Sequence, residues 1–194
     1  MKVDVATLSI AQPVGPWFVT GDQFYLSFGV YETNLVSDLL TLEITETRET
    51  ALQAGFEASG FSGSVFGFNS TNKDGTDNRI NNFGLALGYA HESDALTLAV
   101  NGAYINDNGD SDNLESTIAG NLGSNNVIDH VGGKAIGCVA SFGPFSLIAE
   151  YVTATGVFAA NEVAFRRVGA KPHAWQIEAA YTFTVLEKET TSYH

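Results

Sequence analysis

Residues 173–183 read HAWQIEAAYTF, and this stretch decides the fold class. Side chains in a β-strand point alternately to opposite faces. One parity here is apolar with aromatic residues near both ends (Trp175, Ile177, Ala179, Tyr181, Phe183), and the other is small or polar (Ala174, Gln176, Glu178, Ala180, Thr182). This pattern is typical of a membrane strand that has lipid on one side and water on the other.

The same alternation recurs in four further stretches, at Ala51–Ala58, Asn82–Ala90, Leu96–Tyr104 and Phe145–Tyr151. A soluble β-sandwich also alternates, so the pattern alone leaves both folds open. For a membrane strand, the apolar parity faces lipid. The predicted lipid-facing residues are Leu52, Phe56, Phe83, Leu85, Leu87, Leu96, Leu98, Trp175, Ile177, Tyr181 and Phe183.

The connections between these strands favour the membrane fold, because short and long links alternate. Residues 12–15, 59–60, 92–94 and 142–144 are short links with turn-forming residues, whereas 29–49, 70–79, 106–132 and 153–171 are long. Outer-membrane barrels have short turns at one rim and long loops at the other. We therefore predict an all-β fold, a transmembrane up-and-down antiparallel β-barrel with about nine strands and a further strand beginning near residue 191.

The 194 residues are expected to form one domain, with a mean hydropathy of +0.03. The net charge of −13 argues against nucleic acid as a partner. The single cysteine, Cys138, excludes an internal disulfide bond and is expected to be a small strand residue. The opening residues 1–4 lack the apolar segment of a signal peptide. We therefore expect the barrel to be incomplete in this sequence at both ends, with further strands to follow.

Several blocks of the sequence resemble the LbtU-type siderophore porins, a family of bacterial outer-membrane barrels. These blocks are FGVYETN (28–34) with LVSDLLTLEITETRE (35–49), LQAGFEASGFSGSVFGFN (52–69), INNFGLALGY (80–89), GPFSLIAEYVT (143–153) and GAKPHAWQIEAAYTF (169–183). Asp22 departs from the family, in which a basic residue is expected near this point. The resemblance implies an outer-membrane location and uptake of ferric siderophore, with lipid and lipopolysaccharide as surroundings.

The parity opposite the apolar one predicts which residues line the lumen. These are Gln53, Glu57, Glu150, Gln176 and Glu178. Carboxylates that line a pore favour cations. The same glutamates are equally consistent with a structural role, in which they pair with lysine or arginine across the lumen and plug it.

Four basic residues lie in or beside the predicted long loops and are candidates for contact with an anionic solute such as a ferric siderophore. They are Arg48, Arg166, Arg167 and Lys171. An adjacent arginine pair suits bidentate recognition of carboxylates, provided that its loop folds into the pore. An ordinary surface pair, or contact with lipopolysaccharide phosphates, is the alternative.

The acidic run NDNGDSDN (106–113) suggests a calcium site formed by Asp107, Asp110 and Asp112. It lacks the order of EF-hand ligands, and a solvated, turn-rich loop is the favoured interpretation. Residues 39–52 are ambiguous in another way: they predict either a short helix in a loop that narrows the pore, or a strand beside an external loop.

We find no sequence signature of an enzyme and expect no cofactor, because the histidines have no metal-ligand spacing and no serine lies in a nucleophile motif. The chain is therefore interpreted as an outer-membrane porin that passes ferric siderophore through its lumen. A closed structural or adhesive barrel and a soluble β-sandwich binding module remain the alternatives, and assembly into a homo-oligomer is left open.

Overall fold

The computed structural model describes residues 8–11, 15–30, 32–34, 39–73 and 80–183. Strands dominate, and their bounds are β1 Leu8–Ala11, β2 Trp17–Tyr25, β3 Arg48–Ala58, β4 Phe61–Phe68, β5 Asn82–Glu92, β6 Thr97–Ile105, β7 Gly133–Phe142, β8 Phe145–Ala154, β9 Ala164–Phe165, β10 Val168–Gly169 and β11 His173–Tyr181. The two helices are α1, Leu40–Glu43, and α2, Asp112–Leu122. None of the helices in these ranges has both the length and the apolar character needed to cross a membrane.

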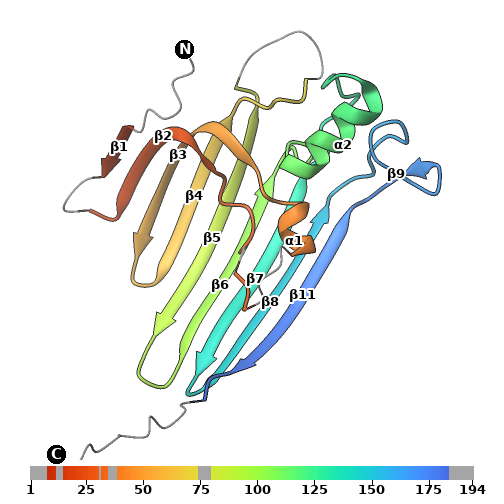
Figure 1. Cartoon of the computed structure of the whole chain (residues 1–194). Helices are drawn as coiled ribbons and strands as arrows, with labels where there is room; N and C mark the ends of the chain where they lie inside the picture. Colours follow the sequence, from red (N-terminus) through yellow and green to blue (C-terminus); the bar gives the residue numbers. More distant parts are fainter. Residues whose placement is uncertain (1–7, 12–14, 31, 35–38, 74–79, 184–194) are drawn as a thin grey trace, which may run out of the picture.

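Nine strands form one antiparallel sheet in the order β1-β2-β3-β4-β5-β6-β7-β8-β11 (Figure 1). Each strand pairs with its neighbour along the chain, and β11 follows β8 because β9 and β10 form a separate hairpin within a long loop. The predicted all-β, up-and-down antiparallel order is thus confirmed. In the described part of the chain β1 pairs only with β2 and β11 only with β8, so these strands do not close on each other.

The predicted alternation of short and long links is also confirmed where the structure describes it. Ser59 and Gly60 join β3 to β4 with φ angles of 53° and 83°, as a two-residue hairpin turn of type I′ requires. Short turns lie at one end of the sheet, whereas α2 and the β9–β10 hairpin lie at the other (Figure 1). The predicted turn at 12–15 and the stub at 191–194 fall largely or wholly outside the described residues.

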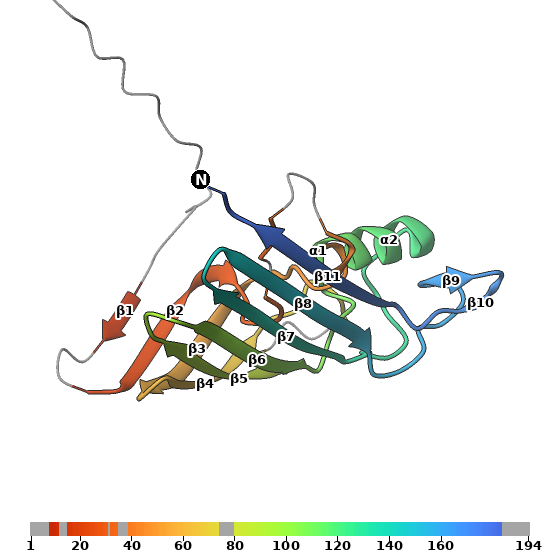
Figure 2. The same ribbon diagram turned by 90° about the horizontal axis from the view of Figure 1, so that it is seen from below.

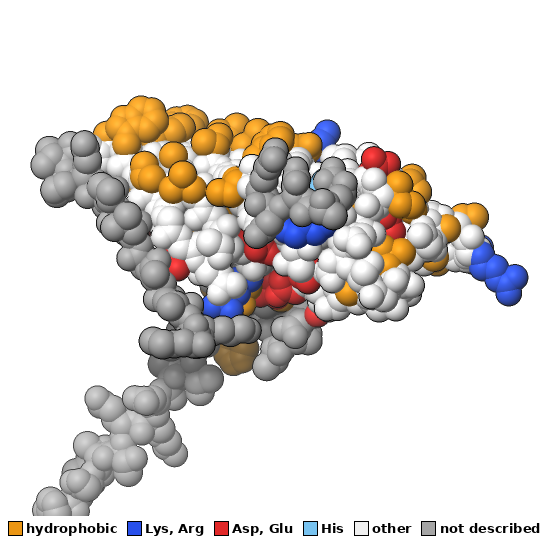
Figure 3. Space-filling model, turned by 90° about the horizontal axis from the view of Figure 1, so that it is seen from above, with side chains coloured by type: hydrophobic (Ala, Val, Ile, Leu, Met, Phe, Trp, Pro, Cys, Tyr) orange, Lys and Arg blue, Asp and Glu red, His pale blue; other side chains and the backbone are white. Residues whose placement is uncertain are grey.

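The strand registers place the apolar parity of every neighbouring strand on the same face. Phe61, Tyr89, Val100, Cys138, Ala149 and Ile177 form one such row across six strands. We call this face, which carries Val65 and Trp175, the convex face. Figure 3 shows hydrophobic side chains gathered along this side of the sheet, while acidic side chains lie on the other side.

The opposite, concave face carries the main apolar core. Phe66, Phe68, Ile105 and Val152 project from it and are buried against residues of the β2–β3 connection, Leu26 and Phe28. Figure 2 shows the sheet curled, with α1 on its inner side beside β11. One sheet and one small hairpin account for all the described strands, so the two packed sheets of a β-sandwich are not found among them.

A second core lies at the long-loop end and contains a helix that the sequence prediction missed. Leu114 and Ile118 of α2 pack with Val131, Phe158 and Val163. Residues 106–113 were expected to form a solvated loop, and this was wrong. Asp107, Asn108, Asp110 and Ser111 are each at most 2% exposed, because α2 and the loops around it cover them.

Candidate functional site

The concave face brings together all five residues that were predicted to line a lumen. Gln53 and Glu57 project from β3, Glu150 from β8, and Gln176 and Glu178 from β11. The register sets Glu150 directly opposite Gln176, and Glu178 is on the same face two residues further along β11. Sequence alternation therefore identified which face these side chains share.

Glu150 and Gln176 do not face open space, because the β2–β3 connection lies over them. We call residues 26–47, of which 31 and 35–38 are not described, the inner loop. The Val30 N–H donates to Glu150 Oε1 at 2.6 Å. The Thr33 hydroxyl donates to Glu178 Oε1 at 2.7 Å, and the Asn34 N–H donates to Glu178 Oε2 at 2.7 Å. Two carboxylates of the sheet thus bind the inner loop.

The glutamines hold the inner loop in the same way. Gln176 Oε1 accepts a hydrogen bond from the Thr41 hydroxyl at 2.9 Å, and its Nε2 donates to the Glu32 carbonyl oxygen at 3.0 Å. Gln53 Nε2 donates to Ser27 Oγ at 3.2 Å. Four of the five predicted lumen residues therefore contact the inner loop through hydrogen bonds.

Glycines in the sheet allow the inner loop to approach this closely. A Cβ atom on Gly137 would lie 1.9 Å from Val30 Cγ2, and one on Gly133 would lie 2.7 Å from the Phe28 ring. A larger residue at either position would therefore force the side chain of Val30 or Phe28 to shift. Glu150 is only 3% exposed beneath the loop, and its Oε2 has no hydrogen-bond partner among the described residues. Its burial makes this carboxylate dependent on the loop for its remaining hydrogen bond.

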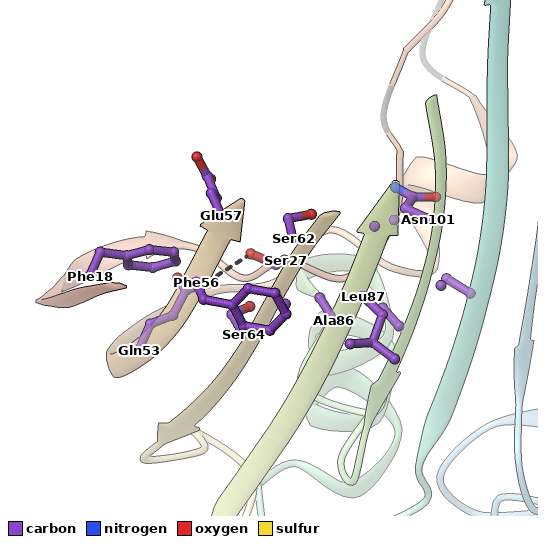
Figure 4. A pocket seen from close by; sticks show the side chains of 16 residues that line it. Phe18, Ser27, Gln53, Phe56, Glu57, Ser62, Ser64, Ala86, Leu87 and Asn101 are labelled. Atoms are coloured by element: carbon purple, nitrogen blue, oxygen red, sulfur yellow. Dashed lines mark hydrogen bonds between the residues drawn. The ribbon is translucent and has the colours of Figure 1, made fainter. Parts of the chain in front are cut away.

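Beside the inner loop, the concave face forms a cavity of about 210 Å³, and Ser27 and Gly29 of the loop are part of its lining. Figure 4 shows its wall, in which Gln53, Glu57, Ser62, Ser64 and Asn101 supply polar groups and Phe18 supplies an aromatic ring. Phe56, Leu87 and small residues such as Ala86, Gly88 and Ala103 line much of the rest. Glu57 is exposed and is the only ionisable residue of this lining.

The apolar residues predicted to face lipid lie on the convex face. Leu52, Phe83, Leu87, Trp175, Ile177 and Tyr181 are 53–68% exposed, Leu85 is 39% and Leu96 is 36% exposed, and Phe183, just after β11, is 73% exposed. Phe56 and Leu98 are half-buried by their neighbours on this face. No described segment covers these side chains.

The predicted basic contacts lie away from the cavity. Arg48 is on the convex face, where its guanidinium lies 5.9 Å from the centre of the Tyr25 ring. Arg166 and Arg167 form the tip of the β9–β10 hairpin, which projects from the sheet (Figure 1). Lys171 is exposed just before β11. The arginine loop therefore does not fold into the lumen, which was the condition for its candidate contact with a siderophore.

The suggested calcium ligands are used in other ways. Asp107 Oδ2 accepts a hydrogen bond from Ser70 Oγ at 2.9 Å and lies 2.7 Å from His130 Nδ1. Asp110 Oδ1 accepts the N–H groups of Thr71 and Asn72 at 3.0 and 3.1 Å. Asp112 begins α2 instead. Across the described ranges, no group of three or more His, Cys, Asp or Glu residues could hold a metal ion.

The buried position of Asp110 changes its acidity. Desolvation by burial, together with the charges of Asp107 and Glu49, raises the pKa of Asp110 to about 8. Desolvation also raises the pKa of Glu115, in the first turn of α2. These carboxyl groups tie the long loops together, so they indicate a structural cluster at this end of the sheet.

Comparison with known proteins gives distant relatives. A protein of Coxiella burnetii named "UPF0422 protein" is 25% identical over 181 residues, which cover 91% of this chain and 38% of the relative. A "UPF0422 protein" of Legionella pneumophila strain Philadelphia 1 is 27% identical over 187 residues, which cover 89% of this chain and 35% of the relative. The strain Lens counterpart is 26% identical over 187 residues.

The chain therefore spans little more than a third of the length of these curated relatives, 35–38%. No family model matches the sequence. No solved structure matches it either. The names of these relatives state no activity.

Proposed function

We propose that this chain forms part of the wall of an outer-membrane β-barrel channel whose lumen is narrowed by the inner loop. The observation that carries the proposal is an exposed apolar face with an aromatic belt at each end. Both belts lie on the convex face. The belt near the short turns consists of Trp17, Phe61, Phe142, Phe145 and Tyr181, and the belt near the long loops consists of Tyr25, Phe83, Tyr104, Tyr151 and Trp175.

The spacing of the belts supports a membrane as the environment of this face. Trp175 and Tyr181 are six residues apart on β11, which is roughly 20 Å along a strand and about 15 Å along the axis of a barrel with a strand tilt of about 40°. Transmembrane barrels carry an apolar band about 25 Å tall between aromatic girdles, so the residues between these two aromatics fit within such a band. Between the belts, Val65, Leu87 and Ile177 are 60–67% exposed. A water-soluble monomer rarely exposes so large a continuous apolar surface.

The open edges of the sheet support closure by additional strands. Unpaired backbone groups of a strand cost several kcal/mol each in lipid, on the order of 2–7 kcal/mol, so membrane sheets close into barrels. The relatives are long enough to supply more strands, since this chain matches only 35–38% of them. We infer that strands beyond this sequence pair with β1 and β11 in the full-length protein.

In such a barrel the concave face is the lumen, and the inner loop narrows it. Hydrogen bonds from Val30, Thr33 and Asn34 occupy the carboxylates of Glu150 and Glu178. Glu150, which is 3% exposed beneath the loop, is thereby shielded from a passing solute, whereas Glu178 is only half-buried and presents its charge to the lumen. Glu57 is exposed at the cavity, so Glu57 and Glu178 are the sources of cation preference on this part of the wall.

Ferric siderophore is the solute that the family resemblance suggests, and the burial of Glu150 beneath the inner loop lowers the repulsion that an acidic lumen would exert on it. Cells with and without the full-length protein should differ in uptake of a radiolabelled ferric siderophore. Equal uptake would remove the siderophore from the proposal and leave the channel itself intact.

Planar-bilayer recording of the full-length protein tests the channel. Glu57→Ala should move the reversal potential in a salt gradient toward zero with little change in conductance, since it removes an exposed charge that does not hold the inner loop. Its matched partner is Glu178→Ala, which releases Thr33 and Asn34 and should increase the conductance and its fluctuations. Absence of current from the wild type and from Glu178→Ala would reject a channel and favour a closed structural or adhesive barrel.

A further inference from the structure

The convex face is not uniformly covered by large side chains, because an apolar groove crosses it between β6 and β11. The groove has a volume of about 400 Å³, and its lining includes Ile136, Cys138, Ala149, Tyr151, Trp175 and Ile177. Cys138 and Ala149 are direct partners across β7 and β8. These two small side chains form a floor between larger apolar neighbours, so the groove can accept a narrow apolar chain.

Basic side chains lie directly beyond the long-loop end of this groove. Lys134 is two residues from Ile136 on β7, and His173 is two residues from Trp175 on β11, which places them on the same face as the groove. Lys134, Thr153 and His173 form one row across three strands. Residues two apart on a strand are about 7 Å apart. The exposed Lys134 is therefore within reach of a polar group at the mouth of the groove.

The β9–β10 hairpin adds two arginines at the long-loop end of the sheet (Figure 1). Arg166 and Arg167 both have positive φ angles, 52° and 71°, at the centre of its turn. Phe165 and Val168, which flank them, are 64% and 62% exposed, and the Arg166 guanidinium lies 5.2 Å from the centre of the Phe165 ring. An exposed pair of apolar and cationic residues of this kind suits the boundary between lipid and headgroups.

The distribution of charge makes this region distinct within a chain of net charge −13. The described part of the sequence contains six lysines and arginines. Four of them lie in β7, in the β9–β10 hairpin or in the approach to β11, namely Lys134, Arg166, Arg167 and Lys171. The other two are Arg48 and Lys73. Positive charge is thus concentrated beside one apolar groove at the long-loop end.

We propose that this groove and its bases bind a phosphorylated, acylated lipid of the outer leaflet. An acyl chain lies along Ile136, Ala149 and Ile177, and a headgroup phosphate meets the ammonium groups of Lys134 and Lys171. The arginines of the hairpin contact the same headgroup layer, where guanidinium groups recognise phosphate by paired hydrogen bonds. This inference rests on the proposed membrane location, because only there does the convex face meet lipid.

The occupant follows from charge and shape together. A soluble anion would use the bases and leave the apolar groove empty, while an apolar ligand would not need the bases. A phosphorylated lipid satisfies both, and lysine or arginine near an anionic lipid surface contributes about 1 kcal/mol each.

Native mass spectrometry of the full-length protein, reconstituted with diphosphorylated or dephosphorylated lipid A, tests the proposal. The double variant Lys134→Gln/Lys171→Gln should bind the phosphorylated lipid roughly 10- to 30-fold more weakly. The matched control is Arg48→Gln, which removes an exposed base from the convex face of β3 and should leave binding unchanged. Ala149→Phe fills the floor of the groove and should weaken binding of both lipids.

The outcomes separate this inference from the proposed channel. Equal binding of the two lipids, or equal binding by the double variant and Arg48→Gln, would overturn the lipid site while the protein still folds in lipid. A wild-type protein that neither folds in lipid nor retains any would instead overturn the membrane location on which the site depends. Weaker binding confined to the double variant and Ala149→Phe supports the site.

Discussion

The two faces of the sheet share the same strands and the same alternation of side chains, yet they differ in what covers them. On the concave face Leu26 and Phe28 of the inner loop are each 1% exposed, and Glu150 beneath the loop is 3% exposed. On the convex face Trp175 is 68% and Val65 is 62% exposed, although both are apolar. A polar face that the protein covers and an apolar face that it leaves bare are the reverse of a soluble sheet. This difference is the reason for the proposal that the convex face meets lipid.

The largest effect on the free energy of unfolding should come from placing a charge on each face in turn. Val65→Lys puts an ammonium group in the middle of the convex face and should destabilise the folded protein in bilayers by about 2–4 kcal/mol, the cost of lysine at the midplane of a barrel. Ser64→Lys, one residue earlier, directs the same group into the cavity and should change the free energy of unfolding by less than about 1 kcal/mol. Urea titrations in lipid vesicles measure both variants. A neutral Val65→Lys would mean that water covers the convex face.

A methyl group added to a glycine tests which face is tightly filled. A Cβ on Gly84 would lie 2.2 Å from the Phe66 ring and 2.7 Å from the Tyr104 carbonyl oxygen. Gly84→Ala should therefore cost about 1–3 kcal/mol, as overpacking does. For Gly102, on the convex face, the nearest atom to a new Cβ is 3.8 Å away, and Gly102→Ala should stay within about 0.5 kcal/mol. Equal effects on unfolding midpoints would show that the concave face is no more tightly filled than the convex face.

A change of one pH unit should give the smallest effect on the free energy of unfolding, through the acidity of Asp110 at the long-loop end. The pKa of Asp110 is raised to about 8, whereas an unfolded aspartate titrates near about 3.9. Between these values the folded state holds a proton that the unfolded state lacks, so this contribution to stability is full at low pH and falls as the pH rises toward 8. The slope is at most about 1.4 kcal/mol per pH unit.

Urea titrations at a series of pH values measure this slope. Asp110→Asn should flatten the dependence, because the amide does not titrate. Asp112→Asn removes an exposed carboxylate at the start of α2 and is the control that should keep the slope. The same slope in Asp110→Asn as in the wild type would contradict a raised pKa for this buried aspartate.

The alternation of side chains was sufficient to predict the strands of the main sheet and the face on which each side chain lies, and the turn-forming residues gave the order of short and long links. It was sufficient because the period of a strand assigns a face to every residue. A loop that narrows the pore was only one of the two alternatives that the sequence left for residues 39–52. Some contacts of the inner loop use the backbone N–H groups of Val30 and Asn34, which every residue except proline carries. Others use the hydroxyl groups of Thr33 and Thr41, and such hydroxyls do not by themselves indicate a partner on the sheet.

The helix α2 was missed although its signals were available. Ser111 precedes it, Asp112 and Glu115 lie in its first turn, and Gly123 ends it with a φ of 68°. Acidic residues near the start of a helix and a glycine after its end are recognised helix signals. The acidic residues were instead interpreted as a solvated loop or a weak calcium site. Burial of Asp107 and Asp110 could not be predicted, because it depends on loops distant in sequence.

The most direct test of the account uses the two tryptophans of this sequence, Trp17 and Trp175, which are 65% and 68% exposed at opposite ends of the convex face. Two variants of the full-length protein would be placed in vesicles containing brominated lipids, one that keeps Trp17 and one that keeps Trp175 as its single tryptophan, with every other tryptophan replaced by phenylalanine. Contact with lipid predicts blue-shifted emission and strong quenching for each remaining tryptophan. Red-shifted emission that brominated lipid does not quench would contradict a lipid-facing convex face.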